Sequence, residues 1–279
     1  MASVLRCLLF LAAGLVPALA GAQLRDGGDP EAVEIWQKLR LSLFADRPIS
    51  LDAGHVIQLE APARAVDAAA VPIAVRAQFA QTPQQHIRHV WLIIDRNPSP
   101  IAAIFTYTQD SGRADIETRV RVDEYTHVRA IAETQDGQLT MATRWVKASG
   151  GCSAPAGLDA GAALATLGQM RLRADAATPG QGGPLRVQWA ISHPNHTGLA
   201  MDQATRQFTP AHFVRQVDIS HAGRPVLSAD LDFAISENPN LWFWFVPLPG
   251  SEGGELKVEV SDSQGLTFRT VAKVGAANH

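Results

Sequence analysis

Cysteine is the residue type whose chemistry stands out in this sequence, because the chain has only two cysteines, Cys7 and Cys152. Cys7 lies in an N-terminal stretch that we expect to be removed during export. Cys152 would then be alone in an oxidising compartment, where an odd cysteine indicates intermolecular pairing or a reactive thiol. A buried, inert core cysteine is the alternative, and counting alone does not decide between them.

The neighbours of Cys152 favour a reactive thiol. Gly150 and Gly151 precede it, so the backbone has wide freedom and no side chain blocks approach to the sulfur. Five extended residues starting from Lys147 would reach about 17 Å, enough for the thiol to enter a cleft on a partner. Such a thiol can accept a thioester-like, disulfide or persulfide adduct and later be discharged. We predict Cys152 as a covalent attachment site on an arm made flexible by Gly150 and Gly151. Lys147 offers a nearby cation, and a linker that merely contains a cysteine is the alternative.

The histidines are the next candidates for chemistry. His193 and His196, with Asp202 and His212 downstream, contain ligand types that bind metals. However, His193 precedes a proline at the end of a predicted strand, where this spacing does not place two rings on one face. We therefore predict no metal site. His86 and His89, three residues apart at the start of a strand, are expected on a solvated rim.

No catalytic machinery is evident in the sequence. It has no phosphate-binding loop, no GxSxG motif and no recognisable pair of catalytic carboxylates. Cysteine catalysis needs a rigidly placed histidine base, and a flexible arm is a poor scaffold for one. We therefore predict no catalytic residues and no cofactor, and we expect a protein that is not an enzyme.

The first 22 residues have the pattern of an export signal. Arg6 supplies the positive charge, residues 8–16 are apolar, and small residues allow cleavage after Ala20 or Ala22. We expect a periplasmic protein with no membrane span, because no later apolar segment is long enough to cross a bilayer. Loss of these residues changes the formal net charge from -3 to about -4. That charge argues against a nucleic-acid partner, which requires a basic surface.

The elements that must position the thiol are mostly strands. One helix is predicted first, capped by Asp29 with Pro30 at its first position. Its expected core face comprises Ala32, Ile35, Trp36, Leu39 and Leu43. From there to Lys147 apolar residues alternate with period two, and Asp136-Gly137 indicates a hairpin between strands at 128–132 and 139–145. Many short strands with a turn about every ten residues are typical of a β-sandwich.

Residues 148–170 interrupt this pattern and form the predicted boundary. The segment begins with small residues, and residues 160–167 are alanine-rich and could form a short helix. Alternating strands then resume, including an aromatic strand at 242–245, which we assign to the core and to domain docking. The predicted organisation is a signal at 1–22, a sandwich at 29–147, an arm and linker at 148–170, and a second sandwich at 171–275.

Several motifs resemble the Sox sulfur-oxidation family. The strand Met141–Lys147 and the Gly150-Gly151-Cys152 that follows resemble the C-terminal Gly-Gly-Cys-Gly-Gly arm of SoxY, the sulfur-carrier subunit of periplasmic thiosulfate oxidation. Residues 36–49, 61–65 and 71–73 are also similar to SoxY. The second half resembles its partner SoxZ at residues 191–194, 197–198, 208–213 and 235–239. Together the matches point to a fused SoxYZ-like carrier of the kind associated with quinoprotein dehydrogenases.

The resemblance implies an all-β protein with two immunoglobulin-like sandwiches, SoxY-like and then SoxZ-like, after a short N-terminal helix. It further implies that Cys152 carries a small sulfur-containing intermediate between periplasmic redox enzymes of a Sox-type or quinoprotein dehydrogenase system. Two departures argue against thiosulfate as the cargo: the arm reads Gly-Gly-Cys-Ser-Ala-Pro, and it is tethered at both ends. The alternative function is a non-catalytic module that docks on a periplasmic dehydrogenase. In that case the cysteine would be incidental or used for an intermolecular disulfide.

Overall fold

The structure is a computed structural model, and it describes residues 27–155, 165–175, 183–201, 205–247 and 254–273. The predicted alanine-rich helix falls mostly outside these residues, as do the export signal and its cleavage site. No helix in the described part of the chain is long and apolar enough to cross a membrane. The all-β prediction of two immunoglobulin-like sandwiches with a short N-terminal helix is confirmed.

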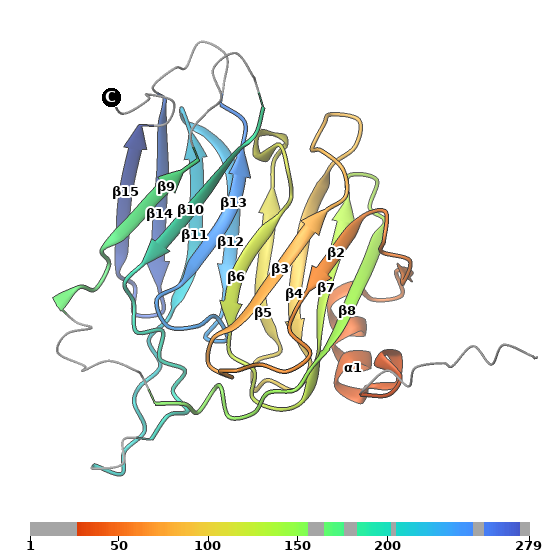
Figure 1. The fold of residues 1–279 in the computed structure, drawn as a ribbon, viewed down its shortest axis with the longest axis vertical. Coiled ribbons are helices and arrows are strands. Elements are labelled where there is room, and N and C mark those ends of the chain that lie inside the picture. The colour runs from red at the N-terminus through yellow and green to blue at the C-terminus, as the bar shows by residue number, and fades with distance from the viewer. Residues whose placement is uncertain (1–26, 156–164, 176–182, 202–204, 248–253, 274–279) are drawn as a thin grey trace, which may run out of the picture.

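The described residues of the first half of the chain form one α-helix and eight strands, whose arrangement Figure 1 shows. The elements are the 3-10 turn η1 (Pro30–Ala32), α1 (Glu34–Phe44), β1 (Ile49–Ser50), β2 (Ile57–Glu60), β3 (Val71–Ala77), β4 (Ile87–Ile94), β5 (Ile101–Tyr107), the 3-10 turn η2 (Gln109–Ser111), β6 (Ile116–Val120), β7 (Thr126–Thr134) and β8 (Leu139–Val146). The predicted hairpin is confirmed, since β7 and β8 pair in antiparallel register and Gly137 adopts a positive φ in their turn.

In the second half, the residues that the structure describes form seven strands. They are β9 (Met170–Ala174), β10 (Leu185–Ile191), β11 (Val214–His221), β12 (Arg224–Leu231), β13 (Asn240–Phe245), β14 (Glu255–Asp262) and β15 (Thr267–Lys273). The predicted aromatic strand is β13. Phe243 and Phe245 are fully buried in the core, while Trp242 and Trp244 lie on the other face of the sheet beneath the guanidinium groups of Arg186 and Arg113.

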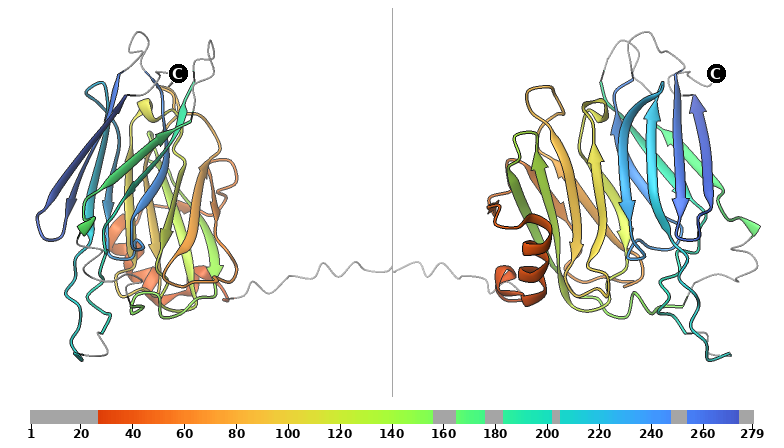
Figure 2. Two further views of the ribbon diagram at one scale, coloured as in Figure 1. Left: turned by 60° about the vertical axis from the view of Figure 1, so that its left-hand side comes forward. Right: turned by 180° about the vertical axis from the view of Figure 1, so that it is seen from behind.

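The two halves are joined through their sheets. One sheet has the order β1-β8-β7-β4-β5-β12-β11-β14-β15, and the other has the order β2-β3-β6-β13-β10-β9. Strands of different halves therefore pair at β5–β12 and at β6–β13. The side-by-side arrangement of the halves is visible from both faces (Figure 2). A single apolar core runs between the sheets, with Val75 and Phe105 from one half and Trp189 and Phe243 from the other.

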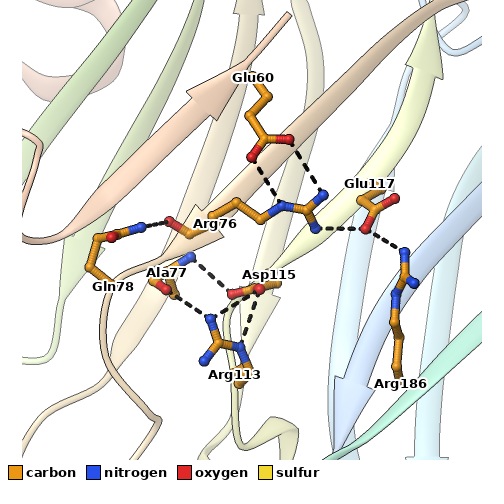
Figure 3. A network of polar contacts seen from close by, with 8 residues as sticks. All are labelled: Glu60, Arg76, Ala77, Gln78, Arg113, Asp115, Glu117 and Arg186. Carbon is orange, nitrogen blue, oxygen red and sulfur yellow. Dashed lines mark hydrogen bonds and ion pairs between the residues drawn. The ribbon is translucent and has the colours of Figure 1, made fainter. Parts of the chain in front are cut away.

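A chain of ion pairs crosses the joint on the outer face of the smaller sheet (Figure 3). Glu117 of β6 accepts hydrogen bonds of 2.6 Å from Arg76 of β3 and from Arg186 of β10. Arg76 also pairs with Glu60 of β2 at 3.4 Å, and Arg186 stacks 4.1 Å from the centre of the Trp242 ring. Because strands of both halves contribute, the network helps to fix the halves relative to each other.

Helix α1 packs on the outer face of the larger sheet. Asp29 caps η1 as predicted, and the helix proper begins at Glu34. Trp36 and Phe44 are buried against Ile93, Ile131, Leu139 and Met141, whereas Ile35 is 43% exposed. The predicted inward positions of Ile35 and of Ala32, which is exposed in η1, are therefore wrong. The helix follows η1 through a break at Val33, which changes the rotational phase that one continuous helix would have had.

Candidate functional site

Cys152 lies in a turn a few residues after β8. The segment that follows β8 runs along the end of the molecule where residues 193–201 and 205–213 project (Figure 1). Its thiol is free of any disulfide, and the residue is fully buried. The sequence predicts an extended, mobile arm, but in this structure the segment is folded back onto the residues between β6 and β7. Its capacity to leave that position stays a prediction.

Four hydrogen bonds hold the cysteine-bearing turn. The amides of Gly150 and Gly151 donate to the carbonyl oxygens of Asp123 (2.8 Å) and Val122 (3.0 Å). The amide of Cys152 donates to the Asp123 carboxylate at 3.2 Å. The hydroxyl of Thr197, from the second half, donates to the Cys152 carbonyl at 2.7 Å. The turn is thus held from both halves of the chain.

The two glycines have a different role from the one expected of them. Gly150 has φ of +78°, a conformation that residues with a side chain rarely adopt. At Gly151 a Cβ atom would overlap the carbonyl oxygens of Ala68 and Val122, the latter at 2.7 Å. In the docked turn, glycine is therefore required for left-handed backbone geometry at position 150 and for close backbone approach at position 151.

The surroundings keep the Cys152 thiol protonated. Burial, and then the negative charge of Asp123, raise the pKa of Cys152 to about 12; Asp232 adds to this rise and Arg121 opposes it. Since the thiolate is the reactive form of cysteine, the docked residue is chemically quiet at neutral pH. The cation that acts on the thiol is Arg121. The expected candidate, Lys147, is instead placed by backbone hydrogen bonds with Ala63 and Ala65.

Arg121 is the residue that sequence reasoning missed. It belongs to an alternating stretch, 116–123, in which charged positions interrupt the apolar ones. In the structure β6 ends at Val120, and Arg121 is only 5% exposed. Its backbone amide donates to Ala234, and its Nη1 donates to the carbonyl of Ile235 at 2.6 Å. No local sequence pattern predicts that the Arg121 side chain is buried, because its burial depends on hydrogen bonds to Ala234 and Ile235, which are more than 100 positions away.

The loop that carries Thr197 is held by buried polar residues. Asn195, with φ of +46°, donates to the Ile235 carbonyl at 2.8 Å and accepts from the Val214 amide at 2.9 Å. The His212 amide donates to the His196 carbonyl at 3.0 Å. Thr197 therefore reaches Cys152 from a loop that is fixed to the second sandwich.

The structure brings together two of the four predicted metal-ligand candidates. His193 and His212 converge on Asp262, which was not among the candidates; His196 lies outside the cluster, and Asp202 lies outside the described residues. The Nε2 atoms of His212 and His193 are 2.7 and 3.5 Å from Oδ2 of Asp262. All three residues are buried.

The geometry of His193 does not suit a metal. The Asn195 amide donates to Nδ1 of His193 at 3.1 Å, so in the neutral ring Nε2 carries the hydrogen. A metal at Nε2 would need the lone pair at that atom. The arrangement instead suits two N–H groups that face one carboxylate oxygen. Burial lowers the pKa of His193 to about 4, which favours this neutral ring.

Apolar side chains are exposed in the loop that contacts Cys152. Leu199, Met201 and Phe208 are 38%, 42% and 59% exposed, and Met201 and Phe208 form an isolated β-bridge. A separate sequence prediction placed His89 on a solvated rim. In the structure its ring is partly buried, and its Nδ1 atom lies 2.8 Å from the Glu133 carboxylate. Exposed apolar side chains in the loop that also carries Thr197 are suited to contact with another protein.

Comparison with known proteins gives two family matches. Residues 40–152 match the model "Sulfur oxidation protein SoxY", and this match ends at Cys152. Residues 172–273 match the model "Sulphur oxidation protein SoxZ". A search of the curated proteins found no match.

Solved structures give weaker similarities. The sulfur carrier protein SoxY from Chlorobium limicola f thiosulfatophilum is 22% identical, with a TM-score of 0.33, over 40% of this chain and 90% of that one. A superoxide reductase (neelaredoxin) from Ignicoccus hospitalis is 15% identical, with a TM-score of 0.31, over 33% of this chain and 79% of that one.

Proposed function

Because this chain combines a SoxY domain and a SoxZ domain in one polypeptide, we propose that it is a covalent sulfur carrier whose attachment site is Cys152. The observation that carries the proposal is the position of this free thiol. It stands at the end of the SoxY match, in a glycine-containing turn that four hydrogen bonds connect to other described parts of the protein. The flexibility that Gly150 and Gly151 would give an undocked arm belongs to the same proposal.

The chemistry around the thiol supports carriage without turnover. The charged groups that act on Cys152 are two aspartates and an arginine, and no histidine base in the described part of the chain is among them. Cysteine catalysis would need a thiol of low pKa with a base beside it. We therefore propose that partner enzymes load and discharge the thiol after the turn opens. The apolar group Leu199, Met201 and Phe208 offers them a contact in the loop that carries Thr197.

The cellular setting is also part of the proposal. We propose that residues 1–22 export the chain to the periplasm, with cleavage after Ala20 or Ala22. The partners would be redox enzymes of a Sox-type or quinoprotein dehydrogenase system, and the cargo a small sulfur-containing group. The export signal, the partner enzymes and the cargo are proposed from the sequence motifs at residues 1–22 and from the resemblance to SoxY and SoxZ.

Intact-mass measurement tests the proposal. Protein isolated from the periplasm should contain a fraction with added mass that maps to Cys152, and Cys152→Ser protein should contain none. The purified adduct should lose its added mass when it is incubated with the partner enzyme. Wild-type protein that is unmodified in cells grown on reduced sulfur compounds, and that no partner enzyme modifies in vitro, would refute carriage.

Burial of the thiol favours a second candidate function, in which the chain is a docking or assembly module for a periplasmic dehydrogenase. Under this hypothesis Cys152 is a core residue or forms an intermolecular disulfide. Partner capture by the Cys152→Ser variant, together with wild-type protein that carries no adduct, would support the module. Loss of product transfer in the same variant would support the carrier.

A further inference from the structure

Arg121 carries a buried positive charge that its hydrogen bonds satisfy only in part. It is 5% exposed, and its Nε atom has no hydrogen-bond partner. Its Nη1 donates to a neutral carbonyl, that of Ile235. In the part of the chain that the structure describes, no carboxylate forms an ion pair with it. Burial lowers the pKa of this guanidinium. A buried cation with an unsatisfied donor is costly, so its presence requires an explanation.

The position of Arg121 relates it to the thiol. Val122 and Asp123, the next two residues, accept the amides of Gly151 and Gly150, and the Asp123 side chain accepts that of Cys152. The docked turn therefore runs directly alongside the backbone that follows Arg121. A negative charge on Cys152, like those of Glu237 and Asp67, would favour the charged form of Arg121 and oppose the effect of burial on its pKa.

The other charged groups around the thiol have the opposite sign. Asp123 and Asp232 both disfavour a negative charge on the sulfur, and Asp123 already accepts the Cys152 amide. Arg121 is the cation that opposes them. A neutral thiol makes no use of a cation, whereas a negative charge on an adduct of Cys152 would be stabilised by Arg121.

We propose that Arg121 is an anion-binding residue for the loaded form of Cys152, which holds the negatively charged free end of an adduct such as a persulfide or a sulfur oxyanion. The inference rests on the proposed carrier function and names a residue of its site. The unpartnered Nε–H would donate to the anionic end when the loaded turn docks. Guanidinium groups form strong, charge-assisted hydrogen bonds with oxyanions.

Two reagents that differ in charge provide the test. Tetrathionate converts a thiolate to Cys–S–S–SO₃⁻ and releases thiosulfate, while methyl methanethiosulfonate gives neutral Cys–S–S–CH₃ and releases methanesulfinate. Each adduct is formed on Cys152 in urea, and the protein is then refolded. Two rates are measured: the rate at which dithiothreitol removes the adduct from unfolded protein and the rate at which it removes the adduct from native protein. The first rate is divided by the second. This ratio is the protection of the adduct by docking.

Arg121→Met should reduce the protection of the anionic adduct roughly tenfold or more, and that of the neutral adduct less than about twofold. Arg119→Met, which removes an exposed cation two residues away, is the matched control and should change neither. Arg121→Lys keeps the charge and should retain most of the protection, which keeps the test decisive if the methionine variant does not fold.

An equal loss for both adducts, or no loss for either, would overturn the inference. The first result would make Arg121 a purely structural residue, and the second would make it irrelevant to the adduct. Neither result bears on carriage itself, because the adducts are made chemically and no partner enzyme is used. Failure of the inference is therefore distinguishable from failure of the proposed function.

Discussion

The hydroxyl of Thr197 should act as a latch on the cysteine-bearing turn. It donates to the Cys152 carbonyl at 2.7 Å, and Thr197 is only 7% exposed. Thr197→Val keeps the shape of the side chain but leaves that carbonyl without its donor while the turn is docked. The cost is about 1–3 kcal/mol. Because the carbonyl can bond to water once the turn is released, this cost favours the open state.

The magnitude follows from local opening. The docked thiol is fully buried, so a reagent in solution reaches it only through the open state. Its pKa of about 12 instead of 9.0 also leaves roughly a thousandfold less thiolate at pH 8 while the turn is docked. A shift of about 1.4 kcal/mol then changes the observed rate about tenfold. We expect Thr197→Val to raise the rate of modification by Ellman's reagent by about 5- to 100-fold, without a comparable change in the cooperative unfolding transition.

Thr118→Val is the matched control for this experiment. Thr118 is 4% exposed, and its hydroxyl donates to the Asn240 carbonyl at 2.9 Å, away from Cys152. It should lower global stability by a similar amount and leave thiol reactivity unchanged. If both variants raised the rate equally, the thiol would be reached only by global unfolding. If Thr197→Val changed nothing, the latch would be refuted.

Two predictions concern stability. Asp95→Asn should destabilise the protein by about 3–5 kcal/mol in chemical denaturation, because it removes the buried carboxylate to which the fully buried Arg129 donates hydrogen bonds of 2.6 and 2.7 Å. The remaining carboxylate partner, Glu31, is partly exposed and lies 3.5 Å away. A loss below about 1 kcal/mol would contradict this. For His193, burial lowers the folded pKa to about 4 from 6.5, so the unfolded state binds the extra proton and stability falls as the pH decreases from about 6.5 to 4. His193→Asn should remove about 3 kcal/mol of that pH-dependent change, and an unaltered profile would show that another group causes it.

The sequence was sufficient to predict features that are repeated or local. Alternation of apolar residues predicted the strands, and Asp136-Gly137 predicted the hairpin, since both depend on neighbouring residues. The odd cysteine and its flanking glycines likewise identified the candidate site. The inward position of Ile35 was wrong because the break at Val33 is a tertiary adjustment that a helical period does not encode.

The site itself depended on contacts that are distant in the sequence. Thr197 meets Cys152 from 45 residues away, and Asp262, which was not among the candidate ligands, lies beside His193 and His212. Arg121 is turned inward by bonds to residues 234 and 235. No local pattern specifies these approaches. The sequence could identify the thiol, but the burial and the neighbouring charges that raise its pKa are properties of the tertiary fold.

The way the halves are joined bears on whether a tethered thiol can move. The sheets pair directly at β5–β12 and β6–β13, and one apolar core spans both halves, so the segment with Cys152 is not what holds them together. Opening of the turn breaks four hydrogen bonds and exposes one cysteine. At about 0.5–1.5 kcal/mol for each bond, with roughly 1 kcal/mol for the side chain, this costs about 3–7 kcal/mol. Such a cost is within the range of local opening and at or below the stability of a typical domain. The thiol can therefore be hidden at rest and presented when a partner binds the open turn, without separation of the two sandwiches.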